Sequence, residues 1–404
     1  MRRIAIIARQ LFDGEAFFHA PEGAAVAFDA GKIVYVGPAS DLPAGEWDTL
    51  SCPDCTLLPG LIDMHVHLTM EGNAHSVDEA YQDSSSMAML RAVSNAEKQI
   101  LHGVTYVRDC GCQGDMAIQL DAAVKSGLIK YSPKVSACGR VLCITGGHGT
   151  FVGRECDGAE EFRKAARETL KSGASFLKMI STGGVISKGT KTGVTQLNVD
   201  EVSAIVAEAE KVGVPTVTHA HGTEGIKIAL NAGVNTIEHA SYVDDEGIDL
   251  FLRTGAMFTS TLLASLRELD HADELPAYMA DKIRMHIERE RDSVRRLISA
   301  GVPALGGTDA GTPFNPHGDL AQQLILLNEH GLSLINTLRA STSLAAKALR
   351  MERQIGYLKP GYAADILAVN GSVQDNLHAL QDVNSVWRDG IPMFHKGNLY
   401  KGGF

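Results

Sequence analysis

One pattern occurs twice, in Val212-Gly213-Val214-Pro215-Thr216-Val217-Thr218-His219 and in Ala232-Gly233-Val234-Asn235-Thr236-Ile237-Glu238-His239. In each copy an amphipathic helix ends at a glycine, which is followed by a short run rich in β-branched residues and then a histidine. Glycine just past a helix takes the left-handed conformation that ends it. The same setting recurs around the glycines at positions 103, 173, 255 and 301. The pattern predicts helices that alternate with short strands.

The alternating region predicts a closed parallel barrel. Apolar residues have helical periodicity over 200–212 and 282–300, whereas the runs after the glycines are too short for helices. Adding 61–66 and 134–137 gives eight strand candidates between residues 61 and 309. Alternation of this kind builds a parallel sheet with helical crossovers. Eight strands without a GxGxxG phosphate loop favour a (β/α)8 TIM-like barrel over an open sheet.

The two flanks of the chain predict a different unit. The runs 4–12, 24–29 and 32–36 near one end, and 364–369, 383–388 and 391–395 near the other, read as strands with tight turns at Asp-Gly or Ala-Gly. Each set is too small to fold alone, so we expect them to pair. The predicted fold class is α/β, with a small β-sandwich domain (1–56 plus 356–404) and a catalytic barrel (57–355).

Composition excludes several classes of function. The 404 residues carry a formal net charge of -11 with both signs interspersed, which argues against nucleic-acid binding. No segment reaches the about 18 consecutive apolar residues of a membrane span. The apolar run Ile4–Ala8 ends at Arg9 and predicts a strand rather than an export signal. We therefore expect a cytoplasmic protein without nucleic-acid or membrane partners, and a homo-oligomer.

The seven cysteines do not form a disulfide framework pattern. Their odd number and dispersion predict a reducing compartment. Cys52-Pro53-Asp54-Cys55 has the spacing of a zinc knuckle or a redox motif, but no second CxxC accompanies it. The other five are interpreted as small apolar core residues.

Histidines stand where predicted barrel strands end, and catalytic groups of such barrels come from those ends. His65 and His67 are two apart on one strand, so both side chains point to the same side. His219 and His239 each lie six residues beyond a helix-ending glycine, which puts them at the same height along the barrel axis. Imidazole nitrogens suit zinc and neighbouring transition metals. These four residues are predicted metal ligands.

Lys178 and Asp309 complete the predicted set. Lys178 is a charged residue inside the apolar run Phe176–Ile180, and a desolvated neutral amine can add carbon dioxide to form a carbamate. The two oxygens of a carbamate can bridge two metals. Asp309 follows the last strand, where a carboxylate beside the attacking water can take its proton and pass it to a leaving amine. Structural alternatives are a lysine that snorkels to the strand end and a helix N-cap.

Taken together, these residues resemble the amidohydrolase superfamily. The resemblance is carried by Pro59-Gly60-Leu61-Ile62-Asp63-Met64-His65-Val66-His67, by Lys178, His219, His239 and Asp309, and by the closing phrase 356–365. It implies a binuclear centre of two divalent ions, usually zinc, bridged by an N6-carboxylated Lys178. It covers nearly the whole chain, including the split sheet domain.

Three further segments resemble the imidazolonepropionase-related group of that superfamily, which contains Xaa-Pro dipeptidases. They are Gly146-Gly147-His148-Gly149, His219-Ala220-His221-Gly222 and Ile237-Glu238-His239-Ala240. The resemblance implies that His148 polarises the scissile carbonyl and that Tyr242 binds a substrate carboxylate. Backbone amides from Val194 to Leu197 are expected to share that task, with His221 beside the substrate.

The predicted activity is hydrolysis of an amide bond in a small substrate, with an Xaa-Pro dipeptide or an N-acyl amino acid as the first choice. Aryl amides, including ochratoxin-like amides, and phenylureas are alternatives. Opening of a cyclic amide, or deamination with one metal, is a further alternative that Lys178 disfavours. A noncatalytic scaffold is the remote alternative, because every expected ligand position is filled.

Overall fold

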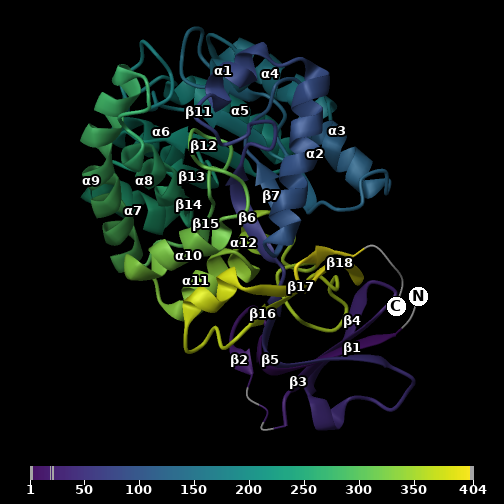
Figure 1. Cartoon of the computed structure of the whole chain (residues 1–404). Helices are drawn as coiled ribbons and strands as arrows, with labels where there is room; N and C mark the ends of the chain where they lie inside the picture. The colour runs from purple at the N-terminus through teal and green to yellow at the C-terminus, as the bar shows by residue number, and fades with distance from the viewer. Residues whose placement is uncertain (1–2, 19, 21, 401–404) are drawn as a thin grey trace.

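The computed structural model describes residues 3–18, 20 and 22–400. A ring of eight parallel strands forms its centre, and helices surround the ring (Figure 1). The strands are β6 (Leu61–Val66), β7 (Val104–Asp109), β8 (Lys134–Ala137), β11 (Leu177–Ile180), β12 (Thr216–Ala220), β13 (Thr236–His239), β14 (Met257–Ser260) and β15 (Ala304–Gly306).

Backbone hydrogen bonds close this ring at two places where regular ladders are missing. The Asp309 N–H donates to the His65 carbonyl at 2.8 Å and joins the end of β15 to β6. The Ser175 N–H donates to the Ala137 carbonyl at 2.9 Å and joins β8 to the residues before β11. The predicted fold class is therefore confirmed.

The third barrel strand is broken, which the sequence did not predict. β8 ends at Ala137, and a second piece, β9 (Val141–Cys143), pairs with β11 and with β10 (Gly153–Glu155). Gly139 lies in the break with a φ of 66°. The loop that carries His148 follows the second piece, β9.

The helices occupy the positions that the glycine pattern predicts. All six glycines have positive φ values, between 70° and 98°. Gly213 ends its helix with a φ of 74°, and its N–H donates to Ala209 and Glu210 carbonyls. The helices are α1 (Ser76–Gln82), α2 (Ser85–Leu101), α3 (Met116–Lys125), α4 (Ala159–Lys171), α5 (Val199–Val212), α6 (Thr223–Asn231), α7 (Asp245–Thr254), α8 (Leu262–Asp270), α9 (Ala277–Ser299), α10 (Leu320–Glu329), α11 (Leu334–Ala340) and α12 (Ser343–Ala348).

Strands from both flanks form one separate, mainly antiparallel sheet, as predicted. Figure 1 shows the purple strands of the first sixty residues beside the yellow strands of the last forty. The order is β19-β18-β17-β16-β5-β1-β3-β4, with β2 on β1. The bounds are β1 (Ile4–Phe12), β2 (Phe17–Phe18), β3 (Ala24–Asp29), β4 (Lys32–Pro38), β5 (Asp48–Pro59), β16 (Ile366–Asn370), β17 (Val383–Arg388), β18 (Ile391–His395) and β19 (Asn398–Leu399).

Strand β5, which lies between β1 and β16, was missed by sequence reasoning. It contains Pro53 and Asp54, residue types that strands disfavour. The register against β1 shifts between Ala8 and Gln10, so an irregularity absorbs this part of the strand. Cys52 and Cys55 are both buried and unbridged.

Among the described residues, no helix combines the length and apolar character needed to cross a membrane. The division into 1–56 plus 356–404 and 57–355 stays a prediction, and residues 1–2, 19, 21 and 401–404 of its first unit lie outside the described residues. The predicted cytoplasmic location and homo-oligomeric state also stay predictions.

Candidate metal centre

The six predicted ligands line a single cavity at the C-terminal ends of the barrel strands. Each ligand comes from a different strand or from the loop that follows it, except the first two, which share β6. The residues are His65, His67, Lys178, His219, His239 and Asp309.

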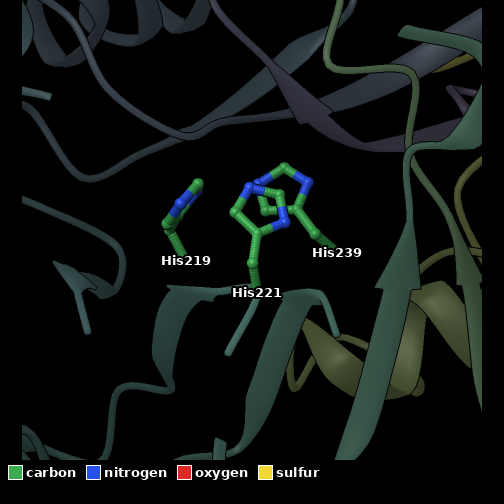
Figure 2. A group of neighbouring side chains, drawn as sticks. All are labelled: His219, His221 and His239. Atoms are coloured by element: carbon green, nitrogen blue, oxygen red, sulfur yellow. The ribbon is translucent and has the colours of Figure 1, made fainter. Parts of the chain in front are cut away.

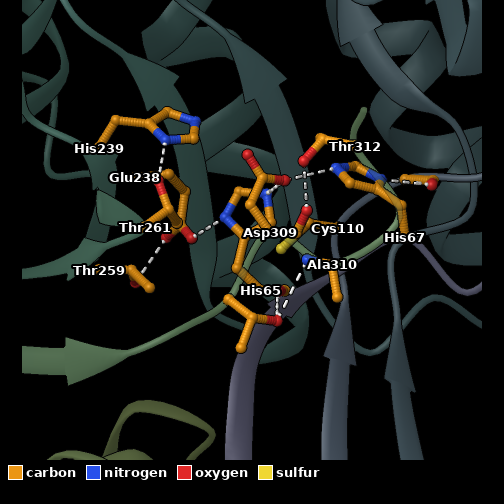
Figure 3. A network of polar contacts seen from close by, with 12 residues as sticks. His65, His67, Cys110, Glu238, His239, Thr259, Thr261, Asp309, Ala310 and Thr312 are labelled. Atoms are coloured by element: carbon orange, nitrogen blue, oxygen red, sulfur yellow. Dashed lines mark hydrogen bonds and ion pairs between the residues drawn. The ribbon is translucent and has the colours of Figure 1, made fainter. Parts of the chain in front are cut away.

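The first group consists of His65, His67 and Asp309 (Figure 3). Asp309 Oδ1 lies 3.3 Å from Nε2 of each histidine, yet it makes no hydrogen bond of good geometry. The other nitrogen of His67, Nδ1, is 2.9 Å from the Gly111 carbonyl. Asp309 has a φ of 56°, a left-handed conformation that a non-glycine residue adopts at a cost. The three ligand atoms of this group lie within 4.8 Å of one another.

The second group consists of His219, His221 and His239, whose ring nitrogens lie within 4.8 Å of one another (Figure 2). His239 Nδ1 contacts Thr261 Oγ1 at 2.6 Å, and His221 Nδ1 contacts Ser241 Oγ at 2.8 Å. Each contact fixes a ring and leaves Nε2 for a ligand. His221 therefore lies as close to His239 as His219 does. The choice of His219 as the metal ligand stays a prediction.

Lys178 lies in the same cavity as both groups and is only 2% exposed. Within the described chain its Nζ has no hydrogen-bond partner. Its charge acts on His65 in the first group and on His239 in the second. A buried ammonium without a partner is unfavourable. This unpartnered amine, together with the poorly satisfied Asp309 Oδ1, fits a group that the protein binds there.

The protonation states also suit divalent cations, which need neutral imidazoles and ionised carboxylates. Burial lowers the pKa of His65 and of His219 well below the ordinary histidine value. Burial alone would raise the pKa of Asp309, but the neighbouring His65 and His67 hold it far below its usual range. His67 is the exception, because Asp309 outweighs burial and raises its pKa. The residues present therefore fit a pair of metal ions.

A charged network inside the barrel positions His65, and sequence reasoning missed it. Glu238 Oε2 lies 2.6 Å from His65 Nδ1, and Arg108 donates to Glu238 Oε1 at 2.7 Å (Figure 3 draws the first contact). Arg108 also donates from Nε to the Met64 carbonyl at 2.7 Å. Because a carboxylate only accepts, His65 donates from Nδ1 and keeps the Nε2 lone pair toward Asp309. The sequence did contain a signal for this network, because Arg108 and Glu238 are charged residues inside two predicted barrel strands.

Arg108→Met is expected to lower the free energy of unfolding by about 3–5 kcal/mol, because it leaves a buried carboxylate unpaired. Arg108 and Glu238 are 1% and 0% exposed. The measurement is urea unfolding of metal-free protein. The control is Arg108→Met combined with Glu238→Leu, which removes both charges and should recover most of the loss. Wild-type stability in the single variant would contradict a structural role for the pair.

His148 lies in the loop after β9 and lines the cavity beside His219, with ring centroids 4.5 Å apart. Its Nδ1 is 2.8 Å from Ser187 Oγ. Burial lowers its pKa to about 3, with His239 and Lys282 adding to the effect. The ring is therefore neutral at ordinary pH. Ser187 belongs to a loop whose carbonyls at 184, 185 and 187 accept from the Lys282 ammonium of α9.

Three residues predicted to bind substrate do not line this cavity: Tyr242, Val194 and Leu197. The Tyr242 hydroxyl is 2.9 Å from His286 Nδ1, and the Arg289 guanidinium lies 3.7 Å from its ring centroid. The amides of Val194 and Leu197 donate within their own loop, to Lys191 and Ser181 carbonyls. The predicted substrate-binding roles of these three residues stay predictions, and their positions outside the cavity lining do not favour them.

His286 and Arg289 were missed because they come from the middle of helix α9, far in sequence from any strand end. Sequence reasoning looked for an arginine only after strands. Tyr242 lies three residues after the end of β13, and the fold brings helix α9 to it.

A model of the amidohydrolase family matches residues 56–394. The chain is 27% identical over 434 residues to ochratoxinase from Aspergillus niger, which covers 96% of this chain and 84% of that protein. Among solved structures, an Xaa-Pro dipeptidase with methionine bound in its active site has a TM-score of 0.89 at 28% identity, over 96% of this chain and 99% of that chain.

A prolidase complexed with N-methylphosphonate-L-proline also has a TM-score of 0.89, at 25% identity over 98% of this chain and 100% of that chain. These matches span nearly the full chains on both sides. The similarity therefore includes the terminal sheet as well as the barrel.

Proposed function

The chain belongs to the amidohydrolase family, and from that premise we propose that it is a two-metal hydrolase that cleaves an amide bond of a small substrate. The first choice of substrate is an Xaa-Pro dipeptide or a related dipeptide or N-acyl amino acid. The observation that carries the proposal is the meeting of six ligand residues in one cavity, with Lys178 buried and unpartnered among them.

One metal would be held by His65, His67 and Asp309, and the other by His219 and His239. Lys178, carboxylated on Nζ, would be shared by both. A donor set rich in histidine nitrogen favours zinc. When bound, two divalent ions would bring the pKa of a water molecule near neutral and polarise the scissile carbonyl.

The protein's own residues would handle the proton and the developing negative charge. The ionised Asp309 would accept a proton from the attacking water and deliver it to the leaving nitrogen. His148 is neutral, and with Nδ1 held at Ser187 its Nε2 would donate to the carbonyl oxygen as charge builds there. Thr261 and Glu238 would keep His239 and His65 in the orientations that ligation needs.

The choice of dipeptides is supported by the two solved structures, a dipeptidase and a prolidase. A bulkier aryl amide is the second candidate. It is favoured by the apolar wall of the cavity, which contains Met70, Val141, Phe151 and Val185, and by the identity to ochratoxinase. The cyclic-amide alternative needs one metal, and the scaffold alternative needs none. A screen of dipeptides, N-acyl amino acids and aryl amides with metal-loaded protein separates these classes.

We expect Xaa-Pro dipeptides to be cleaved with kcat/KM about 100-fold higher than their C-terminal amides. A site built to hydrogen-bond an ionised group rejects an analogue that lacks it, since its donors are then left unpaired. Steady-state kinetics on matched acid and amide pairs provides the measurement. Equal kcat/KM for both forms would shift the assignment to aryl amides or ureas.

Tyr242→Phe tests whether the tyrosine contributes to this recognition. If it does, KM for the acid rises, kcat/KM falls and the amide is unaffected. In the structure the same hydroxyl contacts His286, so His286→Gln is the comparison variant. An equal loss on acid and amide forms would mean that Tyr242 only supports the cavity wall.

A further inference from the structure

One face of helix α8 forms part of the cavity wall. The lining residues are Thr261, Ala264, Ser265 and Glu268, which are spaced as neighbours on a single helix face. The Thr261 hydroxyl contacts His239, so this end of the face reaches the metal ligands. Glu268 lies seven residues further, a rise of about 10 Å along the helix. It is the only charged residue on this face.

Glu268 is buried, with 5% of its surface exposed, yet among the described residues no basic side chain pairs with it. Over residues 3–18, 20 and 22–400, no hydrogen bond or ion pair reaches its carboxylate. Lys282 is occupied by three loop carbonyls, and Lys178 lies among the metal ligands. A buried carboxyl group normally has a hydrogen-bond or charge partner, so an unpartnered one on a cavity wall indicates that its partner enters with the ligand.

The electrostatics of the cavity agree with this reading. Burial raises the pKa of Glu268 to about 8, and the negative charges of Asp309 and Glu290 add to the effect, so the free carboxyl group is mostly protonated at neutral pH. A cation that enters the cavity would favour the ionised form and pair with it. Val185, Ile186 and Phe151 on the same cavity wall are apolar, and the polar wall residues Thr261, Ser265 and Thr312 carry no charge that could compete for a cation.

We propose that Glu268 determines specificity by binding a positively charged group of the substrate, a protonated amine or a guanidinium. The inference rests on the proposed amide hydrolysis and narrows its substrate class. The charge can come from the α-amine of the residue before the scissile bond, from its side chain, or from the side chain of the leaving residue. In each case the chemistry that Glu268 recognises is the same.

The experiment compares metal-loaded wild type and Glu268→Gln on three matched pairs of substrates. Lys-Pro against norleucine-Pro tests the first side chain, Ala-Lys against Ala-norleucine tests the second, and Ala-Pro against N-acetyl-Ala-Pro tests the α-amine. Asp270→Asn is the control, because it removes an exposed carboxylate from the same helix. We expect wild type to prefer the charged member of at least one pair by about 30-fold in kcat/KM.

In Glu268→Gln that preference should fall to within about threefold, with the uncharged member cleaved as in wild type, and Asp270→Asn should keep it. The pair that responds identifies the source of the charge. The inference is overturned by an unchanged preference in Glu268→Gln, by no preference in wild type, or by an equal fall in kcat on charged and uncharged substrates. Turnover without charge preference overturns the Glu268 inference alone. Absence of turnover on every pair counts against dipeptide hydrolysis itself.

Discussion

Lys178→Ala is expected to lose most of its bound metal and to lower kcat at least about 1000-fold, equivalent to several kcal/mol of lost transition-state stabilisation. The side chain is buried among both ligand groups, and its Nζ has no hydrogen-bond partner in the described chain. Without it, two positively charged ions would face each other with no bridging anion. Elemental analysis after gel filtration, together with kcat on the best substrate, measures both effects.

Two controls separate metal loss from misfolding in that experiment. Lys164→Ala removes a lysine whose side chain is 73% exposed on α4 and should change neither quantity. A short carboxylic acid added to Lys178→Ala should restore part of the activity, because it can supply the missing bridging oxygens. Full activity with full metal content in Lys178→Ala would refute the two-metal arrangement.

Asp309→Asn is expected to keep at least one metal while kcat falls by about 10²- to 10⁴-fold. The amide oxygen can still ligate, but the amide cannot accept a proton from water. The wild-type carboxylate stays ionised although it is buried, because His65 and His67 lower its pKa by more than burial raises it. The expected signature is therefore retained metal with lost turnover.

Asp281→Asn, on an exposed position of α9, serves as the control for that substitution. Metal content by elemental analysis and single-turnover kinetics on the same preparation separate binding from chemistry. A wild-type rate in Asp309→Asn would show that the proton travels by another route.

Much of the barrel could be predicted because its signals are local. A helix end, a glycine and a β-branched run fall within ten residues of one another, and the glycine at 213 has the positive φ that the pattern requires. The ligands could be predicted for a related reason, since a parallel barrel gathers all its strand ends on one side. His65 and Asp309 are distant in sequence but adjacent because β15 closes on β6.

The features that were missed depend on contacts between distant segments. Arg108 and Glu238 are 130 residues apart and meet inside the barrel. Tyr242 and its partner His286 are 44 residues apart in sequence. His286 lies within a helix, whereas sequence reasoning searched for site residues only at strand ends. Strand β5 was hidden by Pro53 and Asp54, whose effect an irregularity in the ladder absorbs. His219 and His221 differ by two residues on one strand, so spacing alone cannot say which of them binds metal.

The two-metal account is tested most directly by titrating metal-free protein with zinc and following both bound metal and hydrolysis of the best dipeptide. The account predicts that activity rises until about two ions are bound per chain and then levels off. Carbon dioxide or bicarbonate should be needed during reconstitution, because Lys178 must be carboxylated. Full activity at one ion per chain, or activity that persists in strong chelator, would contradict it.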